Sequence, residues 1–368
     1  MTEHQNIQAQ RLPAEQLYED ELHVLREADT DPRPGGWRLS PGSVRTFILG
    51  SNGKEIGGVT ISRKIFGNEI VVERSIVTLM GKQGLILVGE PGTAKSLLSE
   101  LLAAAISGTS THTVQGGAGV VEEQIRYGWN YAMLIKNGPG PDALVPGPLY
   151  LAMTRGRLMR FEEITRCPTE VQDCLIPVIS DRILHIPELE GGEAAVLSIP
   201  GFNLIATANL RDRGVSEMSS ALKRRFNFET MNPLSDRALE TELVTREVNR
   251  QLAADGIGQS VEPAVMALLV TVFQELRSGR AAGTKLEPLA SIMSTAEAIQ
   301  VAFSAAADGW YLENAPVRAS SLLKHLSGTV IKDDDDDRKR VRHYLRFVRT
   351  KRKKEPVWEE FLQGEKWL

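Results

Sequence analysis

Residues 84–96 read Gly-Leu-Ile-Leu-Val-Gly-Glu-Pro-Gly-Thr-Ala-Lys-Ser, and this stretch decides the fold. Its first part, 84–88, is an apolar run with the length of a short buried strand. A helical pattern rich in Leu and Ala follows over 95–106. Residues 89–96 therefore join a strand to a helix and end in a lysine and a serine, which is the context that a phosphate-binding loop requires.

The chemistry of this loop suits a nucleoside triphosphate with Mg²⁺. Gly89 and Gly92 allow tight turns, so that backbone N–H groups and the start of the helix face the phosphates. Lys95 supplies a charge for the β and γ phosphates, and Ser96 offers its hydroxyl to the metal. Because Ala94 replaces the usual second glycine, we expect it to keep an ordinary helical conformation. The predicted ATP contacts are Gly89, Glu90, Pro91, Gly92, Thr93, Ala94, Lys95, Ser96 and Leu97.

An acidic pair, Glu162-Glu163, follows a third predicted strand at 157–161. In enzymes with a phosphate loop, the first acid at this place holds Mg²⁺, usually through water. The second acid polarises the attacking water as a general base. Glu162 is one methylene longer than the usual Asp. Arg160 is unexpected in a buried parallel strand, and we expect it either to extend toward solvent or to pair with an acid.

The wider pattern predicts an α/β fold. Strand and helix patterns alternate between Val59 and Phe228, which indicates a parallel sheet. A helix opens at Pro168, and Pro177 should kink or end it. The predicted core strands are 84–88, 111–114, 157–161, 203–207 and 225–228. The predicted domains are an N-terminal extension at 1–57, an α/β core at 58–232, a helical lid at 233–331, and an acidic-basic tail helix at 332–368.

Composition sets broad limits on the chain. It has 368 residues and a formal net charge of −4, so it is no general binder of polyanions. Cys167 and Cys174 are two helical turns apart and should not form a disulfide, which favours a reducing compartment. The start of the chain has no signal-peptide pattern, and no apolar run reaches the roughly 20 residues of a membrane span. We expect a cytoplasmic protein without a membrane partner.

Taken together, these motifs resemble the MoxR branch of the AAA+ ATPases. The residues that carry the resemblance are Ile65-Phe66-Gly67-Asn68, Val71-Val72-Glu73-Arg74, the glycine loop, Glu162-Glu163-Ile164-Thr165-Arg166, Ile205-Ala206-Thr207-Ala208-Asn209 and Ala221-Leu222-Lys223-Arg224-Arg225-Phe226. The resemblance covers about 60–230 well and the helical part loosely. It implies a five-stranded sheet in the order 5-1-4-3-2, a helical lid, and a homo-oligomeric ring of about six subunits. It also implies a pre-sensor hairpin at 183–199.

The resemblance assigns further roles. Asn209 would be the first sensor, and an arginine finger would come from Arg225, slightly favoured, or from Arg224, with Arg166 a weaker candidate. Ile65, Phe66 and Gly67 would line the adenine pocket. The second-sensor arginine is missing from Gly283–Ala290. Lys285 or Glu287 stands there instead.

Three functions remain open on the sequence. The first is ATP hydrolysis that remodels or matures a protein client, which the resemblance implies is often one with a von Willebrand factor A domain. A glycine-rich insert, 116–119, with aromatic residues at 127–131 is a candidate for gripping such a client. The second is a nucleic-acid motor, which the basic segment 338–354 favours and the net charge does not. The third is a nucleotide-switched scaffold with little turnover, which Glu162 and the missing second-sensor arginine favour.

Overall fold

The chain folds into two compact units. The computed structural model describes residues 10–209, 216–352 and 354–368. One unit contains the residues up to Gly89 and Ala94–Met231, and the other contains Asn232–Leu368 with the loop residues Glu90–Thr93.

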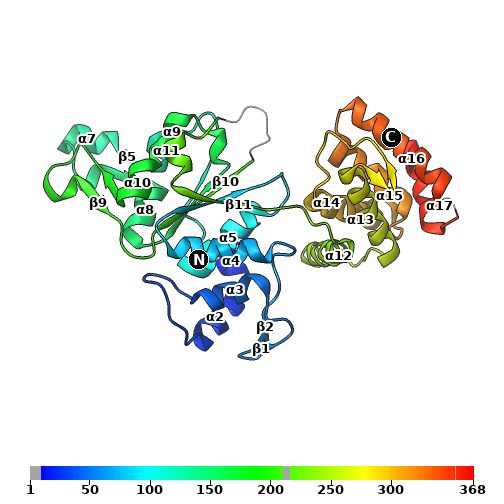
Figure 1. The fold of residues 1–368 in the computed structure, drawn as a ribbon, viewed down its shortest axis with the longest axis horizontal. Helices are drawn as coiled ribbons and strands as arrows, with labels where there is room; N and C mark the ends of the chain where they lie inside the picture. Colours follow the sequence, from blue (N-terminus) through cyan, green and yellow to red (C-terminus); the bar gives the residue numbers. More distant parts are fainter. Residues whose placement is uncertain (1–9, 210–215, 353) are drawn as a thin grey trace, which may run out of the picture. The chain divides into compact units, whose positions relative to one another are not determined.

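A five-stranded parallel sheet forms the centre of the first unit (Figure 1). Its strands are β3 (Gly84–Val88), β4 (Thr113–Gln115), β7 (Leu158–Glu162), β10 (Asn203–Ala208) and β11 (Phe226–Thr230). They lie in the order β11-β3-β10-β7-β4, and each neighbouring pair is parallel. Numbered by position along the chain, this is 5-1-4-3-2, so the predicted fold and strand order are confirmed.

Both faces of the sheet are covered by helices, as the fully apolar sequence of β3 predicts. Leu85 and Leu87 pack into one core and Ile86 and Val88 into the other, because side chains alternate along a strand. The helices α4 (Glu69–Met80) and α5 (Lys95–Ser107) belong to the first core, and α8 (Pro148–Arg155) belongs to the second. This arrangement fixes the end of β3 and the start of α5 beside each other.

The helix that begins after Pro168 is divided into α9 (Thr169–Asp173) and α10 (Leu175–Asp181). Pro177 explains the break, because a proline has no N–H and its ring clashes with the carbonyl four residues earlier, here that of Asp173. The hairpin expected over 183–199 is present as β8 (Ile183–His185) paired antiparallel with β9 (Ala195–Leu197).

The N-terminal segment forms an extra layer on α5. Its elements are α1 (Ala14–Leu17), α2 (Glu19–Ala28), α3 (Pro41–Leu49), β1 (Glu55–Ile56) and β2 (Val59–Thr60). Apolar residues of α3, among them Phe47 and Ile48, are fully buried in the same core as α5. Glu100 on α5 accepts hydrogen bonds from Arg11 Nη2 (2.6 Å) and from the backbone N–H of Ala14 (3.1 Å).

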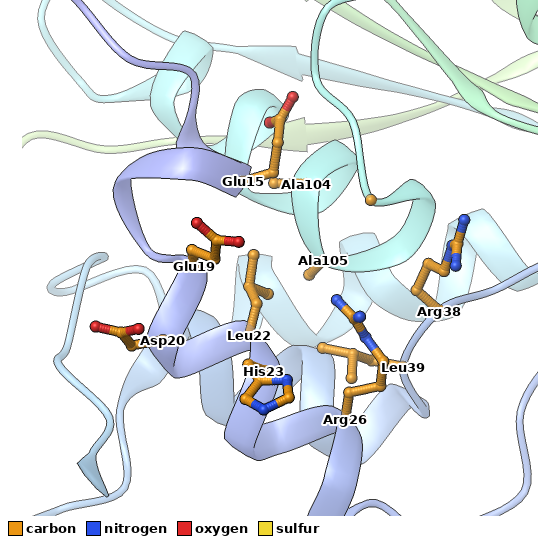
Figure 2. A pocket seen from close by; sticks show the side chains of 11 residues that line it. Glu15, Glu19, Asp20, Leu22, His23, Arg26, Arg38, Leu39, Ala104 and Ala105 are labelled. Carbon is orange, nitrogen blue, oxygen red and sulfur yellow. The ribbon is translucent and has the colours of Figure 1, made fainter.

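A cavity of about 390 Å³ lies between this layer and the C-terminal end of α5 (Figure 2). Glu19 and Arg26, two turns apart on one face of α2, contribute charged side chains, and Leu22, Leu39 and Ala105 contribute apolar walls. The cavity is separate from the glycine loop, which joins the opposite end of α5.

An insert separates β4 from α8. It consists of α6 (Glu122–Ile125), β5 (Tyr127–Trp129), α7 (Tyr131–Asn137), a 3₁₀ turn (Pro141–Ala143) and β6 (Leu144–Pro146), and β5 pairs antiparallel with β6. No residue of α7 is buried, and Tyr131 and Ile135 on it are 73% and 86% exposed. The two residues are four apart and so lie on one face of the helix.

The second unit is helical. Its elements are α12 (Arg237–Ala254), α13 (Pro263–Ser278), β12 (Arg280–Ala281), β13 (Thr284–Lys285), α14 (Thr295–Asp308), α15 (Ala319–Leu326), α16 (Asp335–Lys351), α17 (Pro356–Gln363), π-helical turns at Gly309–Glu313 and Ser327–Ile331, and a last turn at Gly364–Trp367. Its core includes Phe273 from α13, Val301 from α14, Leu345 from α16 and Phe361 from α17, all fully buried. The segment 332–368 therefore packs into the same core as 233–331. No helix in the described part of the chain is long and apolar enough to cross a membrane.

Candidate functional site

The glycine loop contains two residues with left-handed backbone, separated by Thr93. Gly92 has φ of 76° and Ala94 has φ of 64° and ψ of 24°. We expected an ordinary helical conformation at Ala94, and that expectation is wrong. The backbone at Ala94 adopts the same left-handed form that glycine adopts freely, because the chain must turn there into α5. An L-residue is strained in this region by roughly 1–2 kcal/mol.

Lys95 and Ser96 are presented by the first turn of α5. Lys95 Nζ donates a hydrogen bond to the carbonyl oxygen of Gly89 (2.9 Å), so the lysine side chain folds back over the loop that it follows. The Ser96 hydroxyl donates to Oε2 of Glu162 (2.6 Å). The structure therefore brings the predicted loop hydroxyl and the predicted metal-holding acid into direct contact, across adjacent elements α5 and β7.

Glu162 lies at the centre of a buried polar cluster. Thr207 Oγ1 donates to its Oε2 (2.8 Å), Arg160 Nη2 donates to its Oε1 (2.8 Å), and the Ser99 hydroxyl also binds Oε1. Burial on its own would raise the pKa of Glu162. The positive charge of Arg160 and the hydroxyls of Ser96, Ser99 and Thr207 outweigh it and hold the pKa below its ordinary value. The carboxylate is therefore ionised at neutral pH.

Glu163 has a different environment from its neighbour. Its backbone is left-handed (φ 52°), and its N–H donates to Thr207 Oγ1 (2.9 Å). Its carboxylate is about half exposed and forms an ion pair with Arg166 Nε (2.7 Å). Asn209, the predicted sensor, directly follows β10 and is 9% exposed. The two acids and the asparagine thus lie at or just after the ends of the neighbouring parallel strands β7 and β10, at the edge of the sheet where α5 begins.

The donor set at this edge fits Mg²⁺. Mg²⁺ takes hard oxygen ligands and is commonly held by one or two carboxylates together with substrate phosphates and water. Ser96 Oγ and Glu162 Oε2 lie 2.6 Å apart, which brings a hydroxyl and an ionised carboxylate to one place. Among the described residues, no group of three or more His, Cys, Asp or Glu side chains is placed to hold a metal ion. A metal here would therefore depend on phosphate oxygens for most of its shell.

Residues 84–226 match the family model of the AAA domain (dynein-related subfamily), and residues 238–365 match the YehL-like AAA+ ATPase C-terminal domain. The protein YehL of Escherichia coli (strain K12) is 50% identical over 360 residues, which are 98% of each chain. The chain belongs to the YehL-like family of AAA+ ATPases. The predicted resemblance to the MoxR branch is confirmed.

Some relatives of this YehL-like chain are more distant. Chaperone MoxR1 of Mycobacterium tuberculosis (strain ATCC 25618 / H37Rv) is 28% identical over 203 residues, which are 53% of this chain and 50% of MoxR1. Among solved structures, NtrX from Brucella abortus in complex with ADP has a TM-score of 0.49 at 15% identity, covering 82% of this chain and 64% of NtrX. The Holliday junction branch migration motor RuvB of Thermotoga maritima has a TM-score of 0.45 at 17% identity, covering 81% and 87%.

The two finger candidates of this YehL-like chain differ in their surroundings. Arg225 is half-buried, and its guanidinium donates to Ser180 Oγ and to the carbonyl oxygen of Ala221 (2.6 Å for the latter). Arg224 follows α11 (Ser220–Lys223), is exposed, and its guanidinium has no hydrogen bond or ion pair with the described residues. Arg225 is therefore engaged within its own subunit, whereas Arg224 is available to another molecule.

The residues suggested for adenine binding directly precede α4. Ile65 and Phe66 are buried at 2% and 5% exposure, and Gly67 has φ of 72°. The guanidinium of Arg63 stacks over the Phe66 ring at 4.8 Å. Lys285, suggested as a substitute second sensor, is exposed on β13. The roles of these residues stay predictions.

Sequence reasoning missed part of the polar cluster around Glu162. Ser99 and Thr207 were read only as parts of a helix and of a strand. A signal was nevertheless present: Ser99 follows Ser96 by three residues and so lies on the same face of α5. Arg160 was noticed as unusual, and of the two outcomes considered for it, the structure shows pairing with an acid.

Several cations of the basic segment near the end of the YehL-like chain are paired with acids. On α16, Arg338 pairs with Asp335, Lys339 with Asp336, and Arg340 with Asp337. Further along, Arg349 pairs with Glu365 and Arg352 with Glu275. These acids remove much of the positive potential on which nucleic-acid binding depends. The nucleic-acid motor stays a prediction that these ion pairs make less favourable.

Proposed function

We propose that this chain is a Mg²⁺-dependent ATPase. The observation that carries the proposal is the contact between Ser96 and Glu162 at the end of β7, directly beside a glycine loop whose lysine folds back over it. This constellation brings together a hydroxyl, an ionised carboxylate and a positive charge at the start of a helix, which is what a bound triphosphate with its metal needs. Membership of an AAA+ ATPase family supports it.

The environment of each side chain at this site indicates its role in ATP hydrolysis. A bound Mg²⁺, held by Ser96 and Glu162, would offset negative charge on the phosphates. Lys95 would orient the β and γ phosphates as a point charge. Glu163 is the general base, because it is the more exposed of the two acids and can reach water while Glu162 is enclosed. Before it acts, Glu163 must release Arg166, so that ion pair is a restraint on the resting enzyme.

Two variants test the assignment. We expect Lys95→Ala to weaken binding of a fluorescent ATP analogue by tenfold or more, because the loop loses its phosphate-facing charge. We expect Glu163→Gln to bind the analogue as the wild type does but to lose nearly all phosphate release. Unchanged analogue binding in Lys95→Ala would contradict the placement of the nucleotide. Wild-type protein that binds ATP without turnover would instead favour the nucleotide-switched scaffold.

The active form is proposed to be a ring in which one subunit completes the site of the next, as the MoxR-like family suggests. Arg224 supports this, because its guanidinium is free among the described residues and directly follows a helix that packs on the core. A fixed guanidinium stabilises charge on the transferring phosphoryl group. We expect Arg224→Ala to bind ATP normally and lose hydrolysis. Arg225→Ala should instead lower the melting temperature, because Arg225 bonds to Ser180 and Ala221.

The proposed use of the cycle is remodelling of a protein client, supported by the similarity to a chaperone. The insert offers the contact: α7 projects Tyr131 and Ile135 on one exposed face with none of its residues buried. Such a face binds apolar segments of a partner. A client that stimulates ATP turnover should fail to do so with Tyr131→Ser combined with Ile135→Ser. Val77→Ser on α4, at a site with 61% exposure, is the matched control and should retain stimulation.

A further inference from the structure

Arg160 is a buried cation in the strand that carries the acidic pair. It lies in β7 between Met159 and Phe161, which are fully buried, and its side chain is 9% exposed. Its guanidinium donates to four oxygen atoms: Ser99 Oγ (3.0 Å), Ser110 O (3.1 Å), Ser96 O (3.2 Å) and Glu162 Oε1 (2.8 Å). Every N–H-bearing nitrogen of the guanidinium is engaged. The side chain therefore has one position.

These partners lie on three sides of the arginine. Two are on the first turns of α5, one is on the chain leading into β4, and one is the acid two residues along β7. A buried arginine is tolerated only when it is paired and its donors are satisfied. Here the pairing also fixes Glu162, because Oε1 is held by Arg160 and Ser99 while Oε2 faces Ser96 and Thr207.

The charge of Arg160 cancels the charge of the predicted metal ligand. Glu162 and Arg160 together carry no net charge, and Glu163 is paired with Arg166 in the same way. A hydroxyl and a neutralised carboxylate attract a free divalent cation weakly, because affinity for Mg²⁺ depends on ligand charge. A nucleotide triphosphate would add the missing negative charge.

We propose that Arg160 is a positioning residue that acts through Glu162: it holds the carboxylate beside the Ser96 hydroxyl and cancels its charge, so that a divalent cation enters only together with nucleotide phosphates. The inference rests on the proposed ATPase function and deepens it. Arg160 itself contacts neither the metal nor the nucleotide. Its effect is to make metal and nucleotide binding strongly cooperative.

The test measures divalent-cation binding without nucleotide, using Mn²⁺ as the probe and electron paramagnetic resonance to count the free ion. We expect the wild type to bind Mn²⁺ weakly. Arg160→Gln removes the positive charge and still offers N–H donors, so it should bind Mn²⁺ more tightly by roughly tenfold or more. Arg160→Lys retains the charge and should stay within about twofold of wild type. Mn²⁺ bound by the acidic run 333–337 is common to all three proteins. Equal Mn²⁺ affinity in folded Arg160→Gln and wild type would overturn the inference.

If circular dichroism shows that Arg160→Gln does not fold, a second variant provides the test. Arg160→Met removes the charge, fills a similar volume with an apolar side chain and leaves Glu162 unchanged. We expect the Mn²⁺ affinity of this variant without nucleotide to rise severalfold, and an unchanged value would overturn the inference. A fluorescent ATP analogue separates the two proposals. If the wild type does not bind it, the ATPase proposal fails; if it binds and Mn²⁺ affinity is insensitive to Arg160, only this inference fails.

Discussion

Replacing Ala94 with glycine should stabilise the first unit. Ala94 has φ of 64° and ψ of 24°, its methyl group is exposed, and its carbonyl accepts the N–H of Leu98 (2.9 Å). Glycine would keep that hydrogen bond and lose no buried contact. The change therefore isolates the cost of a left-handed backbone in an L-residue.

The magnitude follows from two opposing terms. Relief of left-handed strain is worth roughly 1–2 kcal/mol. The greater freedom of glycine in the unfolded chain costs about 0.5–1 kcal/mol. The net gain is on the order of 0.5–1 kcal/mol, which for a unit of this size corresponds to a rise in melting temperature of about 1–4 °C. Thermal unfolding followed by circular dichroism, without nucleotide, measures it.

The matched control makes the same substitution where the backbone is right-handed. Ala132 is an exposed residue of α7 in the same unit, and Ala132→Gly should leave stability unchanged or lower it by up to about 1 kcal/mol. A higher melting temperature for Ala94→Gly together with an unchanged or lower one for Ala132→Gly would support strain at Ala94. A melting temperature of Ala94→Gly equal to or below that of the wild type would refute the claim that Ala94 is strained.

Two further predictions concern the second unit. Glu240 is fully buried and accepts hydrogen bonds from Arg277, Gln274 and Thr295. Glu240→Gln should lower the free energy of unfolding by about 3–5 kcal/mol, because it leaves the charge of Arg277 uncompensated. Urea unfolding measures this loss, and Glu240→Gln with Arg277→Met should recover part of it. Burial raises the pKa of Asp337, but the side chain of Ser291, the backbone N–H groups of Ala290 and Ser291 and the side chain of Arg340 bring it below its ordinary value. The stability it contributes is present above about pH 4 and is lost as pH falls further, so unfolding between pH 5 and 2 should be less pH-dependent in Asp337→Asn.

The sheet could be predicted because its strands carry unambiguous local signals. Residues 84–88 are apolar at every position, and both faces of β3 are in fact buried. The loop after β3 is defined by residue types whose chemistry hardly depends on context. The strand order followed from the resemblance to a family rather than from the strands themselves. Nothing in an isolated strand specifies its neighbour.

The contacts inside the site were less predictable. Strand alternation gives the face to which Arg160 points, but its four partners come from segments up to 64 residues away in sequence. The conformation of Ala94 was predicted wrongly, because the sequence gives the mean preference of alanine and the required turn overrides it. The charge pattern of 332–368 also does not predict how this segment packs. Asp337 reads as one more surface acid, whereas it is fully buried against the backbone of Ala290 and Ser291.

The N-terminal layer has a practical consequence for biochemical work on this chain. The two family models together begin at residue 84, which invites a shortened protein that starts there. Such a protein would lose α1 to α4 with β1 and β2, and it would uncover the side of α5 that carries Leu101 and Ala105, both fully buried in the whole chain. Glu100 would lose Arg11 and Ala14 at the same time. A poorly soluble fragment is the expected product, and its lack of activity would say nothing about the whole chain.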